Sequence, residues 1–171
     1  MRYNKIRKMD VSNGPGVRVS IFMQGCTFNC KNCFNPETHD FNGGLEFTEK
    51  IIQKILSLAD HEYIAGLSIL GGEPMHPNNI DGTMMLAKAF KERYPKKNIW
   101  VWTGFLFDKG LENQEVLKYI DVLIDGVYKD ELYNPMLKWR GSENQRVIDV
   151  KKSLKAKKVC LYEERGEVCQ S

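Results

Sequence analysis

The sequence predicts an α/β fold with a mostly parallel sheet of about five to six strands, arranged as an incomplete, TIM-like β/α barrel. Strand-like and helix-like segments alternate along the chain, and strands separated by helices form βαβ units with parallel strands. A complete (β/α)8 barrel takes about 250 residues, whereas this chain has 171. Any barrel that it forms is therefore expected to be incomplete.

Hydrophobic patterning locates the elements of this fold. Alternating or continuous apolar runs predict strands, at 17–22, 64–70, 99–102 and 122–124, with shorter strands possible at 147–150 and 159–162. Apolar residues at helical spacing predict helices, from a Thr48 cap to Ala59, over 79–94 and over 113–119. Residues 25–44 lack periodicity and are rich in Asn, Gly, Pro and Cys, which predicts a long functional loop. Residues 128–146 also appear irregular.

Length and composition predict a single domain over residues 1–171, with a core over about 10–150 and a basic extension over 151–171. A content of 42% apolar and 27% charged residues excludes a disordered chain. The net charge of +3 gives no reason to expect a nucleic-acid partner. The chain has neither an apolar run that could span a membrane nor a secretory signal. We therefore expect a cytoplasmic protein.

Three of the five cysteines fall close together, at Cys26, Cys30 and Cys33. Thiolates bind soft metals, chiefly zinc and iron–sulfur clusters. Structural zinc usually takes two close pairs of ligands, whereas a 4Fe-4S cluster held by three cysteines leaves one iron open to a substrate. The spacing therefore favours a cluster. The alternatives are unliganded thiols or a zinc site whose fourth ligand is His39, Cys160 or Cys169.

A second motif, Gly71-Gly72-Glu73-Pro74, follows the predicted strand over 64–70. Consecutive glycines allow a ligand to approach the backbone closely, and Glu73 could accept a hydrogen bond from an ammonium group. Taken alone, the motif could equally be an ordinary strand-to-helix turn. This turn, the three cysteines and residues 102–104 all follow predicted strands, so we expect them to meet at one edge of the sheet.

The Cys-x3-Cys-x2-Cys loop and the downstream Gly-Gly-Glu-Pro resemble the radical S-adenosylmethionine enzymes. The run Asn13-Gly-Pro-Gly16-Val-Arg18 narrows this resemblance to the activating enzymes of glycyl-radical proteins. Five further runs resemble one branch, the activating proteins of the anaerobic, class III ribonucleoside-triphosphate reductase. They are Cys33-Phe-Asn-Pro-Glu-Thr38, Phe41-Asn-Gly-Gly44, Trp102-Thr-Gly104, Ile120-Asp-Val-Leu-Ile-Asp125-Gly126 and Arg140-Gly-Ser-x-Asn-Gln-Arg146. The resemblance covers about residues 10–150.

The resemblance implies an oxidoreductase whose substrate is another protein. In the family, three cysteines hold a 4Fe-4S cluster, and the methionine part of S-adenosylmethionine chelates the fourth iron. Here Cys26, Cys30 and Cys33 match the ligands, and Gly71–Glu73 matches the strip that receives the methionine amino group. One electron cleaves the sulfonium bond, and the resulting 5′-deoxyadenosyl radical takes a hydrogen atom from a glycine of the large reductase subunit. The family also implies flavodoxin or ferredoxin as the electron donor.

The resemblance implies further cofactor-binding positions and no catalytic residue beyond the cluster and cofactor. Asn32, Cys33 and Phe34 match the segment beside the adenine, although Asn32 replaces the aromatic residue that many members have there. Thr103 and Asp125 follow strands near the place where related activases bind a monovalent cation. Two alternatives stay open, an activase of another glycyl-radical enzyme of the pyruvate formate-lyase type and a non-catalytic zinc-binding module. The lysine run over 151–158 is expected to be a solvated face.

Overall fold

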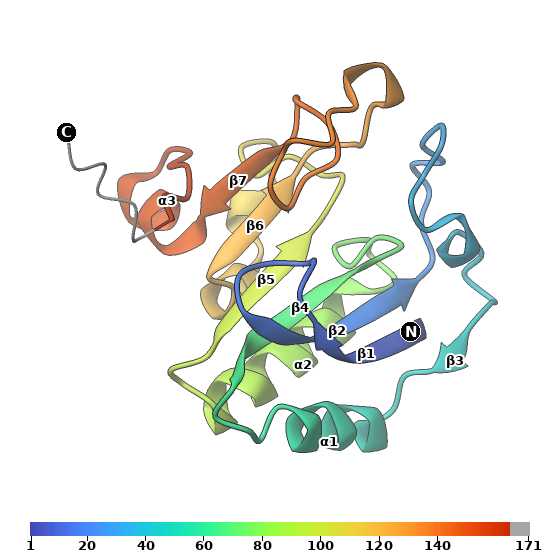
Figure 1. The fold of residues 1–171 in the computed structure, drawn as a ribbon, viewed down its shortest axis with the longest axis vertical. Helices are drawn as coiled ribbons and strands as arrows, with labels where there is room; N and C mark the ends of the chain where they lie inside the picture. The colour runs from blue at the N-terminus through green and yellow to red at the C-terminus, as the bar shows by residue number, and fades with distance from the viewer. Residues whose placement is uncertain (165–171) are drawn as a thin grey trace.

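The computed structural model describes residues 1–164, which form an α/β fold around an open, seven-stranded sheet (Figure 1). The strands are β1 (Arg2–Asp10), β2 (Val17–Gln24), β3 (Leu45–Glu46), β4 (Ile64–Gly71), β5 (Asn98–Trp102), β6 (Val122–Asp125) and β7 (Arg146–Asp149). Their order across the sheet is β3-β1-β2-β4-β5-β6-β7. The four central strands β2, β4, β5 and β6 are parallel, and β1, β3 and β7 join the edges antiparallel.

The predicted α/β class and parallel centre are confirmed, whereas the strand count of five to six is too low. The sequence analysis missed β1, in which five of nine residues are charged, because this strand has no apolar alternation; beyond Tyr3 it is not covered by β3. It also missed the two-residue strand β3. The predicted strand over 159–162 is wrong, since this segment makes a single bridge between Ile148 and Leu161.

The helices are α1 (Glu49–Leu58), α2 (Ile80–Arg93) and α3 (Val150–Ala156), with 3-10 helices η1 (Pro36–Thr38), η2 (Leu111–Asn113), η3 (Glu115–Tyr119) and η4 (Asp130–Leu132). The predicted helices α1 and α2 are confirmed to within one residue at each end. Thr48 is the N-cap residue of α1, but its side chain makes no capping bond. The lysine run over 151–158 was expected to be a solvated face, and residues 151–156 of it lie in α3. Asp149 is the N-cap residue of this helix, and its side chain accepts from the Lys152 N–H.

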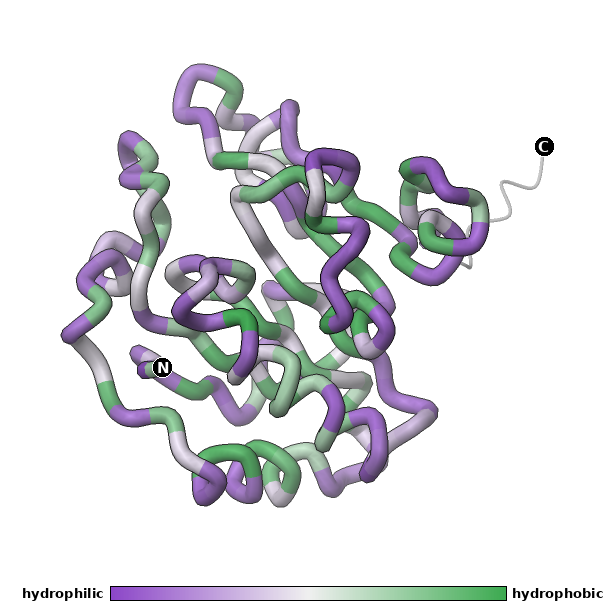
Figure 2. Tube along the Cα trace, turned by 180° about the vertical axis from the view of Figure 1, so that it is seen from behind, coloured by the Kyte–Doolittle hydropathy of each residue, from purple (hydrophilic) through white to green (hydrophobic). Residues whose placement is uncertain are grey.

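The two faces of the sheet have different neighbours. Ile21, Ile69, Val101 and Leu123 lie in register across the central strands and pack in the main core, with residues of α1 and α2. Apolar and hydrophilic stretches alternate along α1, as expected for a helix with one buried side (Figure 2). On the other face, a smaller cluster contains Trp100, Val122 and Ile124, with Trp102, Trp139, Val147 and Tyr162 packed against it.

The parallel strands end together at one edge of the sheet. Gln24, Gly71, Trp102 and Asp125 are the last residues of β2, β4, β5 and β6. In parallel α/β sheets this edge is where ligands bind. Among the described residues, no helix is both long and apolar enough to cross a lipid bilayer.

Candidate functional site

A cavity of about 540 Å³ opens at the carboxyl edge of the parallel strands. This volume lies in the range of about 300–1,000 Å³ that is usual for small-molecule sites. Its lining includes Cys26, Cys30, Cys33, Phe34, Gly71, Gly72, Glu73 and Thr103. The structure therefore brings together the cysteines, the glycine turn and the end of β5, as expected from their positions after strands. Asn32 and Asp125, which were also predicted to contact the cofactor, do not line this cavity.

The cysteine loop, residues 25–44, folds back on its own start. The N–H of Gly25 donates to the carbonyl of Thr38 at 2.8 Å, and the N–H of Cys26 donates to the carbonyl of His39 at 3.1 Å. Asn29 and Asn32 have φ angles of 48° and 54°, in the left-handed region that asparagine tolerates better than most residues. The three cysteines thus lie on a short, bent segment whose two ends are joined.

Each cysteine of the loop is partly exposed and has a backbone N–H near its sulfur. Burial raises the pKa of Cys26 and Cys30, while N–H groups of Phe28 and Tyr128, respectively, act in the opposite direction. The N–H of Asn35 donates to the sulfur of Cys33 at 3.4 Å. An N–H···S bond of this kind stabilises a thiolate that holds an iron–sulfur cluster.

Three thiol donors lining one cavity fit a cluster that keeps one iron open. Within residues 1–164, the structure forms no group of three His, Cys, Asp or Glu side chains that could hold a single metal ion. Three observations support the fit to a cluster: the ligands are thiols, they line one cavity, and backbone N–H groups lie near their sulfurs.

The Glu73 side chain is buried and joins the glycine turn to the end of β5. Its Oε1 accepts from the Thr103 hydroxyl at 2.7 Å and from the Met75 N–H at 2.8 Å, and its Oε2 accepts from the Gly104 N–H at 2.7 Å. Burial raises the pKa of Glu73 to about 7, against the effect of these three donors. The carboxyl group is thus held by neutral donors and has a structural task beside the cavity.

Gly71 and Gly72 occupy positions that no larger residue could share. Gly71 has a φ of +106°, and a Cβ there would lie 2.7 Å from the backbone nitrogen of Met23. A Cβ on Gly72 would lie 2.6 Å from the carbonyl oxygen of Gly25. The turn is therefore packed directly on the end of β2 and the start of the cysteine loop.

The sequence analysis missed Asn79, a buried residue that holds three segments together. Its Nδ2 donates to the carbonyls of Glu73 at 3.0 Å, Gln24 at 3.1 Å and Gly25 at 3.4 Å. Gln24 in turn donates to the carbonyls of Glu37 and Asp40 in the returning part of the loop. Asn79 was recognisable in the sequence only as the first residue of the helix predicted over 79–94.

Two aromatic residues seat the cysteine loop on neighbouring loops. The Phe28 ring packs edge-on against Phe105, with 5.0 Å between centroids, and a Cβ on Gly104 would lie 2.5 Å from this ring. Phe34 packs against Tyr128, also at 5.0 Å, and a Cβ on Gly141 would lie 2.7 Å from its ring. Both glycines are needed because the rings rest directly on the backbone.

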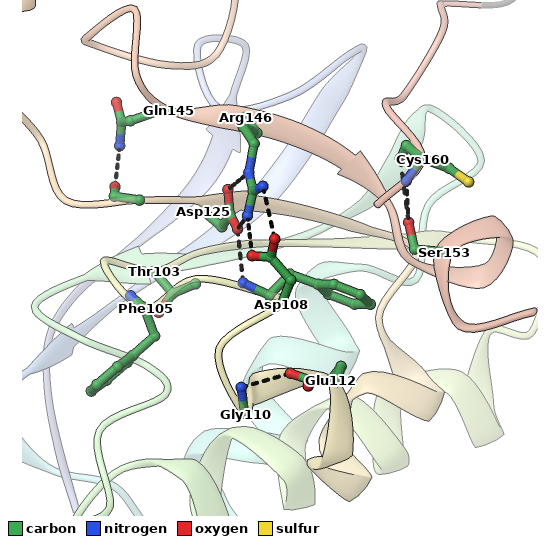
Figure 3. A network of polar contacts seen from close by, with 12 residues as sticks. Thr103, Phe105, Asp108, Gly110, Glu112, Asp125, Gln145, Arg146, Ser153 and Cys160 are labelled. Atoms are coloured by element: carbon green, nitrogen blue, oxygen red, sulfur yellow. Dashed lines mark hydrogen bonds and ion pairs between the residues drawn. The ribbon is translucent and has the colours of Figure 1, made fainter. Parts of the chain in front are cut away.

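Asp125 is fully buried and is engaged in an ion pair (Figure 3). Its Oδ1 accepts from Nε of Arg146 at 2.9 Å, and its Oδ2 accepts from a terminal nitrogen of Arg146 at 2.5 Å and from the Phe107 N–H at 2.8 Å. Arg146 also pairs with Asp108 at 2.9 Å. The structure thus commits both oxygens of Asp125 to protein partners, and Asp125 does not line the cavity.

The remaining candidate ligands are spread over the molecule. His39 lines the cavity, whereas Cys160 does not. The Cys160 N–H donates to the Ser153 hydroxyl beyond β7 (Figure 3). Asp149 at the end of β7 pairs with Val122 at the start of β6. Cys160 is therefore at the opposite edge of the sheet from the cysteine loop. Cys169 lies outside the described residues.

Comparisons with known proteins agree with this site. Residues 12–148 match the family described as a 4Fe-4S single cluster domain. The anaerobic ribonucleoside-triphosphate reductase-activating protein of Enterobacteria phage T4 is 41% identical over 147 residues, which cover 86% of this chain and 93% of the relative. Proteins of the same name from Vibrio cholerae and Escherichia coli K12 are 40% and 37% identical, over 85% and 86% of this chain and 96% and 97% of the relatives.

These matches decide between the metal centres that the cysteine spacing left open. The matched family is described by a 4Fe-4S cluster, so the cluster interpretation is confirmed over the zinc module. The relatives match over nearly their whole length, at identities well above the level of chance similarity. The chain belongs to the family of anaerobic ribonucleoside-triphosphate reductase-activating proteins.

Proposed function

We propose that this chain uses a 4Fe-4S cluster and S-adenosylmethionine to generate the glycyl radical of anaerobic ribonucleoside-triphosphate reductase. The observation that carries the proposal is one cavity lined by all three close cysteines and by the glycine turn, in a chain of this family. When bound, the cluster and S-adenosylmethionine supply a 5′-deoxyadenosyl radical that takes a hydrogen atom from a glycine of the reductase.

The residues of the cavity divide the remaining work. Cys26, Cys30 and Cys33 hold three irons of the cluster. The turn at Gly71–Glu73 offers a close backbone approach to the methionine end of the cofactor, because neither glycine carries a side chain. Thr103 holds Glu73, through the hydroxyl that donates to its carboxyl group.

The adenine end of the cofactor is assigned to the segment around the third cysteine. Cys33 and Phe34 line the cavity there, and Asn32 directly precedes them on the loop. Asp125 contributes indirectly, since it fixes β7 and the segment before it through Arg146. A cation at Asp125 is not part of this proposal because both carboxylate oxygens already have partners.

The open sheet supports access by a protein substrate. The parallel strands β2, β4, β5 and β6 follow one another in sequence order across the sheet, with α1 and α2 packed on one face. We interpret this arrangement as part of a β/α barrel whose missing strands leave the cavity accessible to a loop of the reductase. Flavodoxin or ferredoxin is the proposed electron donor, and the exposed side chain of Lys31 places the cysteine loop at the surface, within reach of a donor.

Anaerobic reconstitution with iron and sulfide tests the cluster ligands. The wild-type protein should become brown, Cys30→Ala should lose the visible absorbance of the cluster, and Cys160→Ala should keep it. Retention of an intact cluster by Cys30→Ala would contradict the ligand assignment.

The reaction is tested with a reductase deuterated at its radical glycine. Deuterium should appear in 5′-deoxyadenosine, and the reductase should acquire the electron paramagnetic resonance signal of a glycyl radical. Cleavage of S-adenosylmethionine without deuterium in the product would overturn the proposal. A signal that appears only on a pyruvate formate-lyase type of partner would reassign the substrate.

A further inference from the structure

The segment between β6 and β7, residues 126–145, lies against the cysteine loop. Both segments rise from the same end of the sheet (Figure 1). Tyr128 packs its ring on Phe34 at 5.0 Å, and its backbone N–H lies near enough to the Cys30 sulfur to act against the rise in the pKa of that thiol. Gly141, near the other end of the segment, supports the ring of Phe34. The segment thus touches the loop at the second cysteine and just after the third.

One carboxylate joins the two segments at the tip of the loop. Asp130 Oδ2 accepts from Nδ2 of Asn32 at 2.9 Å and lies 3.7 Å from Nζ of Lys31. Asp130 Oδ1 accepts from the hydroxyl of Tyr128 at 3.2 Å. Lys31 and Asn32 are the two residues between Cys30 and Cys33. Asp130 is therefore bonded to both residues that separate two cluster ligands, and to the residue whose N–H reaches one of them.

We propose that Asp130 is a positioning residue that fixes the loop between Cys30 and Cys33 for cluster binding. This inference rests on the proposed ligation of the cluster by the three cysteines. We call Asp130 and its three partners the Asp130 latch; the partners are Lys31, Asn32 and Tyr128.

The backbone of the loop needs such a fixed point. Asn32 has a φ of 54°, in the left-handed region that is less favourable for residues other than glycine, although asparagine tolerates it better than most. An exposed ion pair such as Lys31–Asp130 contributes little by itself. Three groups that converge on one partly buried carboxylate restrict the loop much more, because releasing one of them leaves the others in place.

The latch also determines the environment of the Cys30 sulfur. The Tyr128 hydroxyl and the Tyr128 N–H belong to one residue, so the bond to Asp130 limits how far that N–H can move from the thiolate. Groups that orient metal ligands typically change metal affinity about 10–100-fold when they are removed. The expected effect of losing the latch is therefore a cluster that binds but is lost sooner and is less uniform.

The test measures loss of the reconstituted cluster to an iron chelator under anaerobic conditions. Asp130→Ala should lose the cluster about tenfold faster than the wild type. The matched control is Glu131→Ala, which removes the neighbouring, exposed carboxylate and should behave like the wild type. Asp130→Asn keeps an acceptor and should fall between the two. The electron paramagnetic resonance spectrum of the reduced cluster should broaden in Asp130→Ala only.

Two variants that leave every charge in place distinguish the effect of the latch from a general loss of stability. Asn32→Ala and Tyr128→Phe each remove one bond to Asp130 and should speed cluster loss, with no shift in the urea midpoint of the cluster-free protein. Asn32→Ala should add little in the Asp130→Ala background, because the same bond is already gone. Loss rates in Asp130→Ala and Asn32→Ala equal to the Glu131→Ala rate would overturn the latch. A wild-type protein that holds no cluster would instead overturn the cysteine ligation, so the two failures are distinguishable.

Discussion

Strands β4 and β6 lead to the same edge of the sheet, and a buried carboxyl group lies at the end of each. The two carboxyl groups have different partners. Glu73, two residues after β4, is 1% exposed and is held by a hydroxyl and two backbone N–H groups. Asp125, the last residue of β6, is 0% exposed and is held by the guanidinium of Arg146. The two carboxyl groups are thus equally buried, but Glu73 is held by neutral donors and Asp125 by a positive charge.

This difference divides the edge into two parts. At the β6 end, Arg146 forms ion pairs with Asp125 and Asp108, and none of the three residues lines the cavity. This end therefore has a structural role, joining β6 to β7. At the β4 end, Glu73 lines the cavity, and burial raises its pKa to about 7. Similar residues after neighbouring strands thus differ in task, and their partners rather than their burial distinguish them.

The largest effect is expected from removing the charge partner of Asp125. Arg146→Ala leaves a fully buried carboxylate without its cation, and breaking a buried pair in this way costs roughly 4 kcal/mol. Urea unfolding of the cluster-free protein measures the loss. Asp108→Ala is the matched comparison, because Asp108 is half exposed and Arg146 still pairs with Asp125 in this variant. The free energy of unfolding should fall by less than about 1 kcal/mol. Equal losses in the two variants would show that burial of Asp125 does not decide the effect.

The next effect concerns the pH dependence that Glu73 gives the cluster-free protein. Its pKa is about 7 in the folded chain against an ordinary value of 4.5, so between these values the folded state keeps a proton that the unfolded state has lost. The contribution to stability is complete below pH 4.5 and declines as the pH rises toward 7. The decline amounts to about 3 kcal/mol for a shift of this size.

Glu73→Gln removes this titration while keeping the shape of the protonated side chain. Its free energy of unfolding should rise relative to that of the wild type between pH 4.5 and 7, in urea unfolding series at several pH values. Glu62→Gln, which removes an exposed carboxylate, is the matched control. Parallel curves for Glu73→Gln and the wild type would show that the buried group carries no extra proton.

The sequence was informative where the physical cause is local. Buried apolar runs identify β2, β4, β5 and β6, and their common direction places the cysteines beside the glycine turn. Periodicity also identifies α1 and α2, since each buries one side. These features fix the fold class and bring the cavity together.

The parts that the sequence analysis missed depend on contacts between distant residues. The bond between Asn32 and Asp130 joins residues 98 positions apart. Asp125 is recognisable as a strand-end acid, but nothing local indicates that its partner is Arg146, 21 positions away at the start of β7. The partners of Glu73 follow β5, so its motif indicates a turn without indicating where the carboxyl group points. Local patterns therefore predict which residues meet and leave open which of them bind one another.

The smallest effect tests the β4 end through Gly104, whose N–H holds Glu73 and whose Cα supports Phe28. In Gly104→Ala, the new Cβ would lie 2.5 Å from the Phe28 ring, and overpacking of this kind costs about 2 kcal/mol. In the Phe28→Ala background the ring is gone, so Gly104→Ala should cost much less in the same urea measurement. An unchanged cost in that background would place the strain in the backbone of Gly104. A reduced cost would show that Phe28, on the loop carrying the cysteines, and Gly104, whose N–H holds Glu73, meet in one contact.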